Sequence, residues 1–215
     1  MLNTQAEFEH ITDPFAIHLA QNALAAESVK SLYENAPRDG YKRVVVSDPN
    51  HDKQYAMNLL SLQKGGDKIS AVTDSLSPQW KQLLQELRGD QFVSWLERGT
   101  GIKLRHLATE IGIYIHDPGD FISVHKDKTD KALTAILYLT PYWPEDGGGQ
   151  YEVRNSPDPA DEPARRISPR AGQFLAFPPS EKSWHSVSEV TASDEVKRIT
   201  VQLEFWLEGG GKRSD

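Results

Sequence analysis

Two residues that can bind a metal stand two positions apart in FISVHKD, a segment with the composition of a β-strand: His125 and Asp127. Side chains at positions i and i+2 of a strand point to the same face, so an imidazole and a carboxylate converge there while Lys126 points away. A third ligand must come from elsewhere, and the best candidate is His185 of SWHSV, because it lies in a late strand-like segment. Two histidines and one carboxylate on one face of a metal ion leave its opposite positions open for other molecules.

This ligand set is the facial triad of non-haem iron(II) oxygenases, in which cosubstrate and dioxygen occupy the open positions. A His-x-Asp pair needs its structural context before it supports a metal site. The remaining histidines with no partner pattern are interpreted as surface or core residues. They are His10, His18, His51 and His106.

The elements that would position these ligands are β-strands, which dominate from about Leu104 onward. In LRHLATEIGIYIH, apolar residues alternate with Glu110, Gly112, Tyr114 and His116, the period expected of a strand with two different faces. Six further strand-like segments follow, separated by Gly, Pro and Asp turns: FISVHKD, ALTAILYLT, GQYEVRN, GQFLAFPP, SWHSVSEV and KRITVQLEFWLE. Seven strands of this kind predict a sandwich or barrel of jelly-roll type.

The first half of the chain mixes helix and strand signals. AAESVKSLYENAP has the apolar period of a helix, and YKRVVVS and YAMNLLSL are typical of strands. Ser77 followed by Pro78 predicts the start of a second helix, and Asp90 can cap a third that ends at a glycine. We therefore expect an α+β, mainly β chain with one domain over 1–215. Residues 1–103 would form a helical and strand support region, and residues 104–208 the β core.

The order of these segments resembles the prolyl-hydroxylase-like branch of the 2-oxoglutarate/Fe(II) oxygenases. The matching pieces are GIYIHDPGDFISVHKD, LTAILYLT, a GG-x-Y turn at residues 148–151, SPRAGQFLAFPP, SWHSV and KRITVQLEFW. They extend from about Ile111 to Trp206, a little under half the chain. The resemblance implies a double-stranded β-helix core of jelly-roll or cupin-like form, buttressed by N-terminal helices.

The resemblance also assigns roles to individual residues. His125, Asp127 and His185 match the iron ligands. Arg198 matches the basic residue that anchors the far carboxylate of 2-oxoglutarate, a role that suits the planar guanidinium fork. Two hydroxyl groups are expected to reach the same cosubstrate: those of Tyr138 in ILYLT and of Thr200, which shares the strand face of Arg198.

The interval from His185 to Arg198 is longer than the family's commonest spacing, so the strand register leaves an alternative open. A slipped register would turn Lys197 toward the pocket in place of Arg198. Thr200 and Gln202 share the face of Arg198, whereas apolar residues share that of Lys197. A pocket for a charged cosubstrate requires the polar face, which favours Arg198.

Four further residues are candidates for the substrate pocket: Tyr114, His116, Arg154 and Trp184. Tyr114 resembles a tyrosine that lines the pocket near the iron, and His116 shares its strand face. Arg154 borders a proline-rich segment at about residues 155–172, long enough to act as a lid over a site. The alternative readings are barrel packing for Trp184 and a solvated face for Arg154 and the arginines at 165 and 166.

Composition limits the function further. With 215 residues, 38 % hydrophobic and 26 % charged, the chain is typical of a globular domain. The net charge of −7 comes without a basic stripe, which argues against nucleic acid as a partner. No stretch approaches the roughly 20 apolar residues of a membrane span. The absence of cysteine excludes thiolate ligands and disulfides, and we expect a cytoplasmic monomer or homodimer.

The predicted activity is that of an Fe(II)- and 2-oxoglutarate-dependent dioxygenase. It would hydroxylate an unactivated C–H of an amino-acid-derived small molecule or a peptide, using O2 and releasing succinate and CO2. The carboxylate at Asp127 favours hydroxylation, because related halogenases have Gly or Ala at this position; desaturation, ring closure and epimerisation stay open. The alternative class is a cupin-like metal protein or isomerase without oxygen chemistry, which would need neither Arg198 nor Tyr138.

Overall fold

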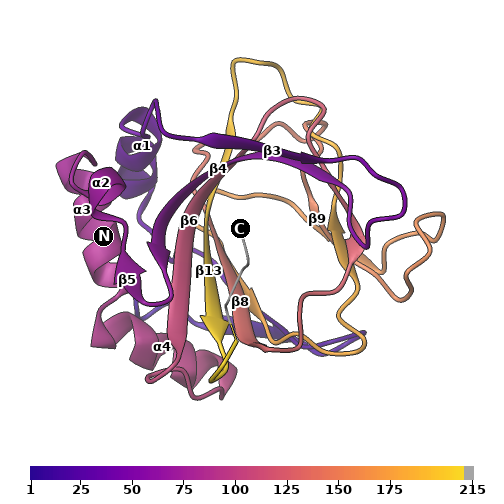
Figure 1. The fold of residues 1–215 in the computed structure, drawn as a ribbon, viewed down its shortest axis with the longest axis horizontal. Helices are drawn as coiled ribbons and strands as arrows, with labels where there is room; N and C mark the ends of the chain where they lie inside the picture. Colours follow the sequence, from indigo (N-terminus) through magenta and orange to yellow (C-terminus); the bar gives the residue numbers. More distant parts are fainter. Residues whose placement is uncertain (211–215) are drawn as a thin grey trace.

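The computed structural model describes residues 1–210, in which four helices lie on one side of a curled antiparallel sheet (Figure 1). The helices are α1 (Ala26–Glu34), α2 (Ser70–Thr73), α3 (Pro78–Leu87) and α4 (Asp90–Thr100). The strands of the first half are β1 (Phe8–Ile11), β2 (Ile17–Ala20), β3 (Lys42–Val46), β4 (Tyr55–Lys64) and β5 (Asp67–Lys68). Those of the second half are β6 (Ala108–His116), β7 (Ile122–His125), β8 (Lys131–Tyr138), β9 (Tyr151–Val153), β10 (Arg165–Ile167), β11 (Phe174–Phe177), β12 (His185–Val187) and β13 (Arg198–Trp206).

The strand order shows how the sheet curls. Neighbouring strands run β1-β2-β11-β8-β13-β6-β4-β7-β12-β9-β10, and β3 and β5 also pair with β4. Only one residue pair, Tyr55 with Ile122, joins β4 to β7. A larger part ending at β4 and a smaller part of β7, β12, β9 and β10 therefore meet at this short contact, which hydrogen bonds between residues 56 and 121 and between residues 54 and 123 flank. The mainly β fold and the jelly-roll type of core predicted from sequence are confirmed.

The two faces of β13 separate the hydrophobic core from the polar interior of the curl. Ile199, Val201, Leu203 and Phe205 belong to the apolar core that also contains the buried residues of the helices. Trp80 of α3 and Trp95 of α4 are among the largest side chains of that core. The alternate residues of β13, beginning with Arg198, face the other way, as the period of a strand requires.

The helix ends follow the sequence signals with small differences. Pro78 occupies the first turn of α3 after Ser77, although the Ser77 hydroxyl makes no capping hydrogen bond. Asp90 is the first residue of α4 and Gly89 takes the cap position, so Asp90 acts through its charge in the first turn. The helix ends at Gly101, whose φ of 74° is the left-handed conformation that glycine adopts without strain.

The support region and the β core share one sheet. β4 pairs with β6 and touches β7, and β2 pairs with β11, so strands from the first half lie between and beside those of the second. Inside the segment at 155–172, β10 pairs with β9, which makes part of the expected loop a strand. Among residues 1–210, no helix has the length and apolar character needed to cross a lipid bilayer.

Candidate metal and cosubstrate site

The three predicted ligands lie together at and just beyond the paired ends of β7 and β12. His125 ends β7 and His185 begins β12, and the two residues are direct partners across the strands. Ligand atoms of His125, Asp127 and His185 all lie within 4.8 Å of one another. The Nε2 atom of His125 is 3.8 Å from Oδ1 of Asp127. This is the separation expected of groups that can share one metal ion.

Backbone carbonyls hold both imidazoles in the tautomer that a metal needs. The Nδ1–H of His125 donates to the carbonyl of Ser123 and that of His185 to the carbonyl of Ser183, each at 2.8 Å. Burial lowers the pKa of both histidines, so the rings are neutral near pH 7. With Nδ1 protonated and donating, the lone pair of each Nε2 faces the cluster and is available to a metal.

Asp127 is held by one oxygen and leaves the other toward the histidines. Its Oδ2 accepts a hydrogen bond of 2.5 Å from Thr134 and lies 3.3 Å from Nζ of Lys131. Lys131 in turn makes an ion pair of 2.7 Å with Glu204 and lies over the ring of Trp206. Burial alone would raise the pKa of Asp127, but the Lys131 ammonium and neighbouring groups outweigh it and hold that pKa below its usual range. The carboxylate is therefore ionised and can serve as a ligand.

Aromatic rings fix His185 from two sides. Tyr151 stacks on it with ring centroids 5.2 Å apart, and Phe177 packs edge-on at 4.8 Å. Tyr151 is the last residue of the GG-x-Y turn. At the two glycines of this turn, Gly148 and Gly149, a larger residue would be sterically unfavourable. A β-carbon at Gly148 would lie 1.9 Å from the carbonyl oxygen of Glu189, and both glycines have φ near +60°.

The same cavity contains Arg198, fully buried on the polar face of β13. Its Nε donates to the carbonyl of Gly149 at 2.7 Å, and Nη1 donates to Nδ1 of His116 at 3.4 Å. In the described part of the chain, no carboxylate lies within ion-pair distance of this guanidinium. Lys197 points elsewhere, to Asp117 at 2.6 Å. The register that places Arg198 inside is the one that the polar face predicted.

Unsatisfied polar groups surround Arg198. The hydroxyls of Tyr138 and Thr200 and the Nε2 of His116 are buried and have no hydrogen-bond partner within residues 1–210. Strand pairing makes them neighbours, because Arg198 faces His116 across β6 and Thr200 faces Tyr138 across β8. Buried polar groups are usually paired, so this cluster indicates space for a polar guest. Tyr114 also lines the cavity, whereas its neighbour His116 lies beside the arginine.

A second, outer pocket of about 410 Å³ opens beside the metal cluster. It shares His125, Asp127, Lys53 and Lys131 with the inner cavity, so the two spaces lie on either side of these residues. The other side chains that line it are His51, Asp52, Lys126, Lys128, Trp184 and Trp206. Trp184, a candidate pocket residue from sequence, lies under the ammonium of Lys126 at 4.8 Å from the ring centroid.

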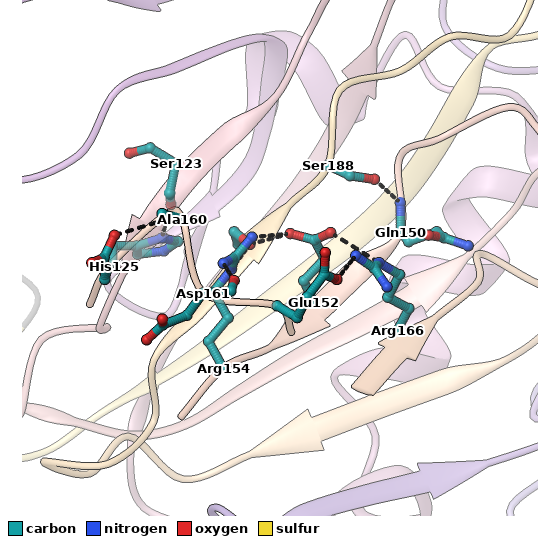
Figure 2. A network of polar contacts seen from close by, with 12 residues as sticks. Ser123, His125, Gln150, Glu152, Arg154, Ala160, Asp161, Arg166 and Ser188 are labelled. Atoms are coloured by element: carbon teal, nitrogen blue, oxygen red, sulfur yellow. Dashed lines mark hydrogen bonds and ion pairs between the residues drawn. The ribbon is translucent and has the colours of Figure 1, made fainter. Parts of the chain in front are cut away.

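Arg154 does not lie where the sequence suggested. Figure 2 shows the Glu152 carboxylate between Arg154 and Arg166, with ion pairs of 2.7 Å and 3.4 Å. Ser186 donates to Glu152 as well, at 2.7 Å. Because residue 186 follows a ligand histidine on β12, its side chain points to the opposite face of the strand. The expectation of Arg154 in the pocket is therefore corrected: it ties β9 to the segment at 155–167 on the outer face.

Sequence reasoning missed residues that surround the ligands: Lys53, Lys131, Thr134, Tyr151, Phe177 and Glu204. A signal existed for Thr134, because it is the polar member of the strand face shared with Ile136 and Tyr138 in ALTAILYLT. No comparable signal existed for the pairing of Lys131 with Glu204, which are 73 positions apart in the chain.

Comparison with known proteins agrees with this geometry. Residues 111–207 match the family model of the 2OG-Fe(II) oxygenase superfamily. Prolyl 3-hydroxylase sudestada1 of Drosophila melanogaster is 27 % identical over 96 % of this chain, and the chain spans 37 % of that relative's length. A Pseudomonas putida prolyl-4-hydroxylase superposes with a TM-score of 0.60 at 19 % identity, covering 89 % of this chain and 92 % of its own. A Trichoplax adhaerens prolyl hydroxylase, solved with a hypoxia-inducible factor peptide, gives 0.58 at 18 % identity, covering 90 % and 84 %.

The curled sheet and the His-Asp-His cluster define a chain with an oxygenase fold. Over residues 111–207 the chain is similar to the 2-oxoglutarate/Fe(II) oxygenase superfamily, and its similar relatives and structural neighbours include prolyl hydroxylases. Members of this superfamily use iron(II), 2-oxoglutarate and dioxygen.

The residues present fit these groups. Two neutral imidazoles and one carboxylate are a suitable donor set for iron(II). A buried guanidinium without a carboxylate, next to unpartnered hydroxyls, suits the far end of a dicarboxylate.

Proposed function

We propose that this chain is an iron(II)- and 2-oxoglutarate-dependent hydroxylase whose metal ligands are His125, Asp127 and His185. The observation that carries the proposal is the shared cavity. One end of it holds the ligand cluster with both Nε2 lone pairs available to a metal, and the other holds Arg198, which has no acidic partner among residues 1–210. A dicarboxylate fits this cavity, because one end of the molecule can chelate the metal while its far carboxylate pairs with the Arg198 guanidinium.

Arg198, Tyr138 and Thr200 are proposed to bind 2-oxoglutarate. The guanidinium is already oriented by Gly149 and His116, so little side-chain freedom is lost when a carboxylate arrives. The hydroxyls of Tyr138 and Thr200 are donors that find no acceptor in the described part of the chain. A cupin-like protein without 2-oxoglutarate would not use these three groups, and the buried Arg198 guanidinium would have no anion to offset its charge. Both points argue against that alternative.

Iron(II) with 2-oxoglutarate and dioxygen would supply the oxidising chemistry, converting an unactivated C–H to C–OH with release of succinate and CO2. The chain's own contribution is to hold the metal and the cosubstrate in position and to shield them from water. Tyr151 and Phe177 fix one ligand ring and keep water from its faces. Arg198 orients the cosubstrate from the far end of the cavity.

For the substrate we propose a prolyl residue within a peptide or protein. The curated relative is a prolyl 3-hydroxylase and two structural neighbours are prolyl hydroxylases. The outer pocket supports this with its own chemistry, since four lysines and two tryptophans line it. A prolyl peptide suits such a lining, because the prolyl nitrogen has no N–H to leave unpaired and both neighbouring carbonyls accept hydrogen bonds. A free amino-acid-derived molecule is the alternative.

An anaerobic titration tests the site. Metal-free protein receives iron(II) and then 2-oxoglutarate, and we expect a weak visible charge-transfer band that requires both. Arg198→Ala should keep metal binding and lose the band at the same cosubstrate concentration. Arg105→Ala, at an exposed ion pair far from the cavity, is the matched control. Metal binding without a band in the unaltered protein would refute the oxygenase assignment and favour the cupin-like one.

Succinate release then tests the substrate. A set of proline-containing peptides is compared with the same peptides carrying alanine in place of proline, and with free proline. The proposal expects release, and a mass gain of one oxygen, for prolyl peptides alone. Turnover of free proline at equal efficiency would replace the peptide substrate with a small molecule.

The setting of the protein is also a proposal. For a cysteine-free, acidic chain we propose the cytoplasm as location, no nucleic acid partner, and a monomeric or homodimeric state. Cell fractionation and light scattering test these statements.

A further inference from the structure

A buried ion pair lies behind the carboxylate of the ligand cluster. Lys131 and Glu204 have side chains that are 7 % and 10 % exposed, and their charged atoms are 2.7 Å apart. The same ammonium reaches Oδ2 of Asp127 at 3.3 Å. Lys131 is therefore shared between two carboxylates, of which only one belongs to the ligand cluster.

The outer oxygen of Asp127 is fully used by these contacts. A carboxylate oxygen has two lone-pair directions. At Oδ2 one is taken by the hydroxyl of Thr134 and the other faces the ammonium of Lys131. The inner oxygen, Oδ1, is the atom nearest His125 Nε2. The two oxygens of one side chain thus have different environments, one saturated with donors and one facing the histidines.

We propose that Lys131, supported by Glu204 and Thr134, is a positioning residue that makes Asp127 a one-oxygen ligand. This inference rests on the proposed function. A carboxylate that binds a metal through both oxygens occupies two coordination positions. Holding Oδ2 away keeps the second position open, and 2-oxoglutarate needs two positions to chelate. Lys131 thereby determines cosubstrate affinity without touching the cosubstrate.

Strand geometry explains why this device is needed here. β7 ends at His125, so Asp127 lies beyond the last residue that the strand holds in place. Lys131 and Thr134 belong to β8, and Glu204 to β13, which pairs with β8 opposite Thr134. The orientation of the ligand carboxylate therefore comes from two neighbouring strands.

The test is a variant that removes the buried charges together. Lys131→Met/Glu204→Gln keeps side chains of similar length and leaves neither member of the buried Lys131–Glu204 pair as an unpaired ion, while Asp127 stays paired with the bound metal ion. Circular dichroism and the melting temperature of the cobalt(II) form check its fold. Cobalt(II) binding is measured first, and 2-oxoglutarate binding is then measured by calorimetry at saturating cobalt(II). Lys30→Met, at an exposed pair on α1, is the matched control.

The expected result is a 2-oxoglutarate dissociation constant raised by about tenfold or more, the usual size of effects from groups that orient metal ligands. Thr134→Val, which removes only the hydroxyl, should also raise the 2-oxoglutarate dissociation constant. Lys131→Arg in a protein that keeps Glu204 retains the buried ion pair and should retain most of the affinity. Should the double variant not fold, Thr134→Val carries the test alone.

Unchanged 2-oxoglutarate affinity in the cobalt(II) forms of the folded variants would overturn the inference, whatever happens to cobalt affinity. A natural-sequence protein that binds cobalt(II) but not 2-oxoglutarate would overturn the proposed function, and this inference with it.

Discussion

Replacing Gly149 by alanine separates backbone strain from damage to the cosubstrate site. Gly149 has a φ of +61°, and an added β-carbon would lie 2.8 Å from Cδ and 3.1 Å from Nε of Arg198. Real β-carbons do not approach another carbon so closely, so the arginine must move. Because its Nε donates to the Gly149 carbonyl and the side chain is buried, that movement carries the guanidinium from its present position.

Two magnitudes follow. An alanine in the left-handed region costs about 1–2 kcal/mol, which corresponds to a loss of about 2–8 °C in melting temperature for a chain of this size. A displaced guanidinium weakens a charge-assisted hydrogen bond to the cosubstrate, worth about 1.5–3 kcal/mol, or roughly 10- to 100-fold in affinity. Only the second effect depends on Arg198.

Gly101→Ala provides the control. Gly101 has a φ of +74° and no atom lies within 4 Å of its added β-carbon, so it suffers the strain alone. Thermal unfolding and calorimetry with 2-oxoglutarate on the cobalt(II) forms measure both effects. We expect a lowered melting temperature in both variants, with the larger loss in Gly149→Ala, and weakened 2-oxoglutarate binding in Gly149→Ala only. Equal cosubstrate affinities would refute the placement of Arg198 at the cosubstrate.

Two further predictions concern stability. Burial, followed by the charges of nearby arginines, lowers the pKa of His116 well below its ordinary value. Below about pH 6.5 the His116 side chain therefore binds a proton in the unfolded chain but stays neutral in the folded protein. His116 thus lowers the unfolding free energy as the pH falls below this value and has no such effect above it. His116→Gln should reduce the acid sensitivity of the metal-free protein's unfolding free energy by up to about 1.4 kcal/mol per pH unit, and identical pH profiles would contradict this. Glu152→Gln should lower the unfolding free energy by about 1–3 kcal/mol, because it weakens the charged hydrogen bonds to Arg154 and Ser186, yet leave 2-oxoglutarate affinity unchanged. Weaker cosubstrate binding in that variant would show that the outer face does reach the site.

The sequence predicted the class of fold and a set of site residues that the structure brings together, but not which distant strands pair. Alternation along a strand was enough to choose Arg198 over Lys197, because the choice depends only on which residues share a face. The same alternation rule placed Asp127 beside His125, but alternation is only part of the reason why the two side chains lie together. The strand ends at His125, and the carboxylate is held by residues of β8 that the rule does not consider.

Contacts between distant segments were beyond the sequence patterns. β1 and β2 are short strands of four residues each, and β2 joins the sheet only through its pairing with β11, more than 150 positions away. Local periodicity contains no information about such a partner. The prediction that Arg154 lines the pocket missed for a related reason. Its partner Glu152 is close in sequence, but the face of the sheet on which both side chains lie depends on the pairing of β9 with β12.

The place of β13 in the sheet has a consequence for how the chain folds during synthesis. β13 lies between β6 and β8 and pairs with both along most of its length, yet it follows them in the chain. Until residues 198–206 have left the ribosome, those two strands face each other across an empty strand position with unpaired edges. Such edges favour association with other chains, and pairing over long sequence separations is slow. A nascent chain of this protein should therefore depend on protection from aggregation until β13 arrives, and that strand brings Arg198 with it.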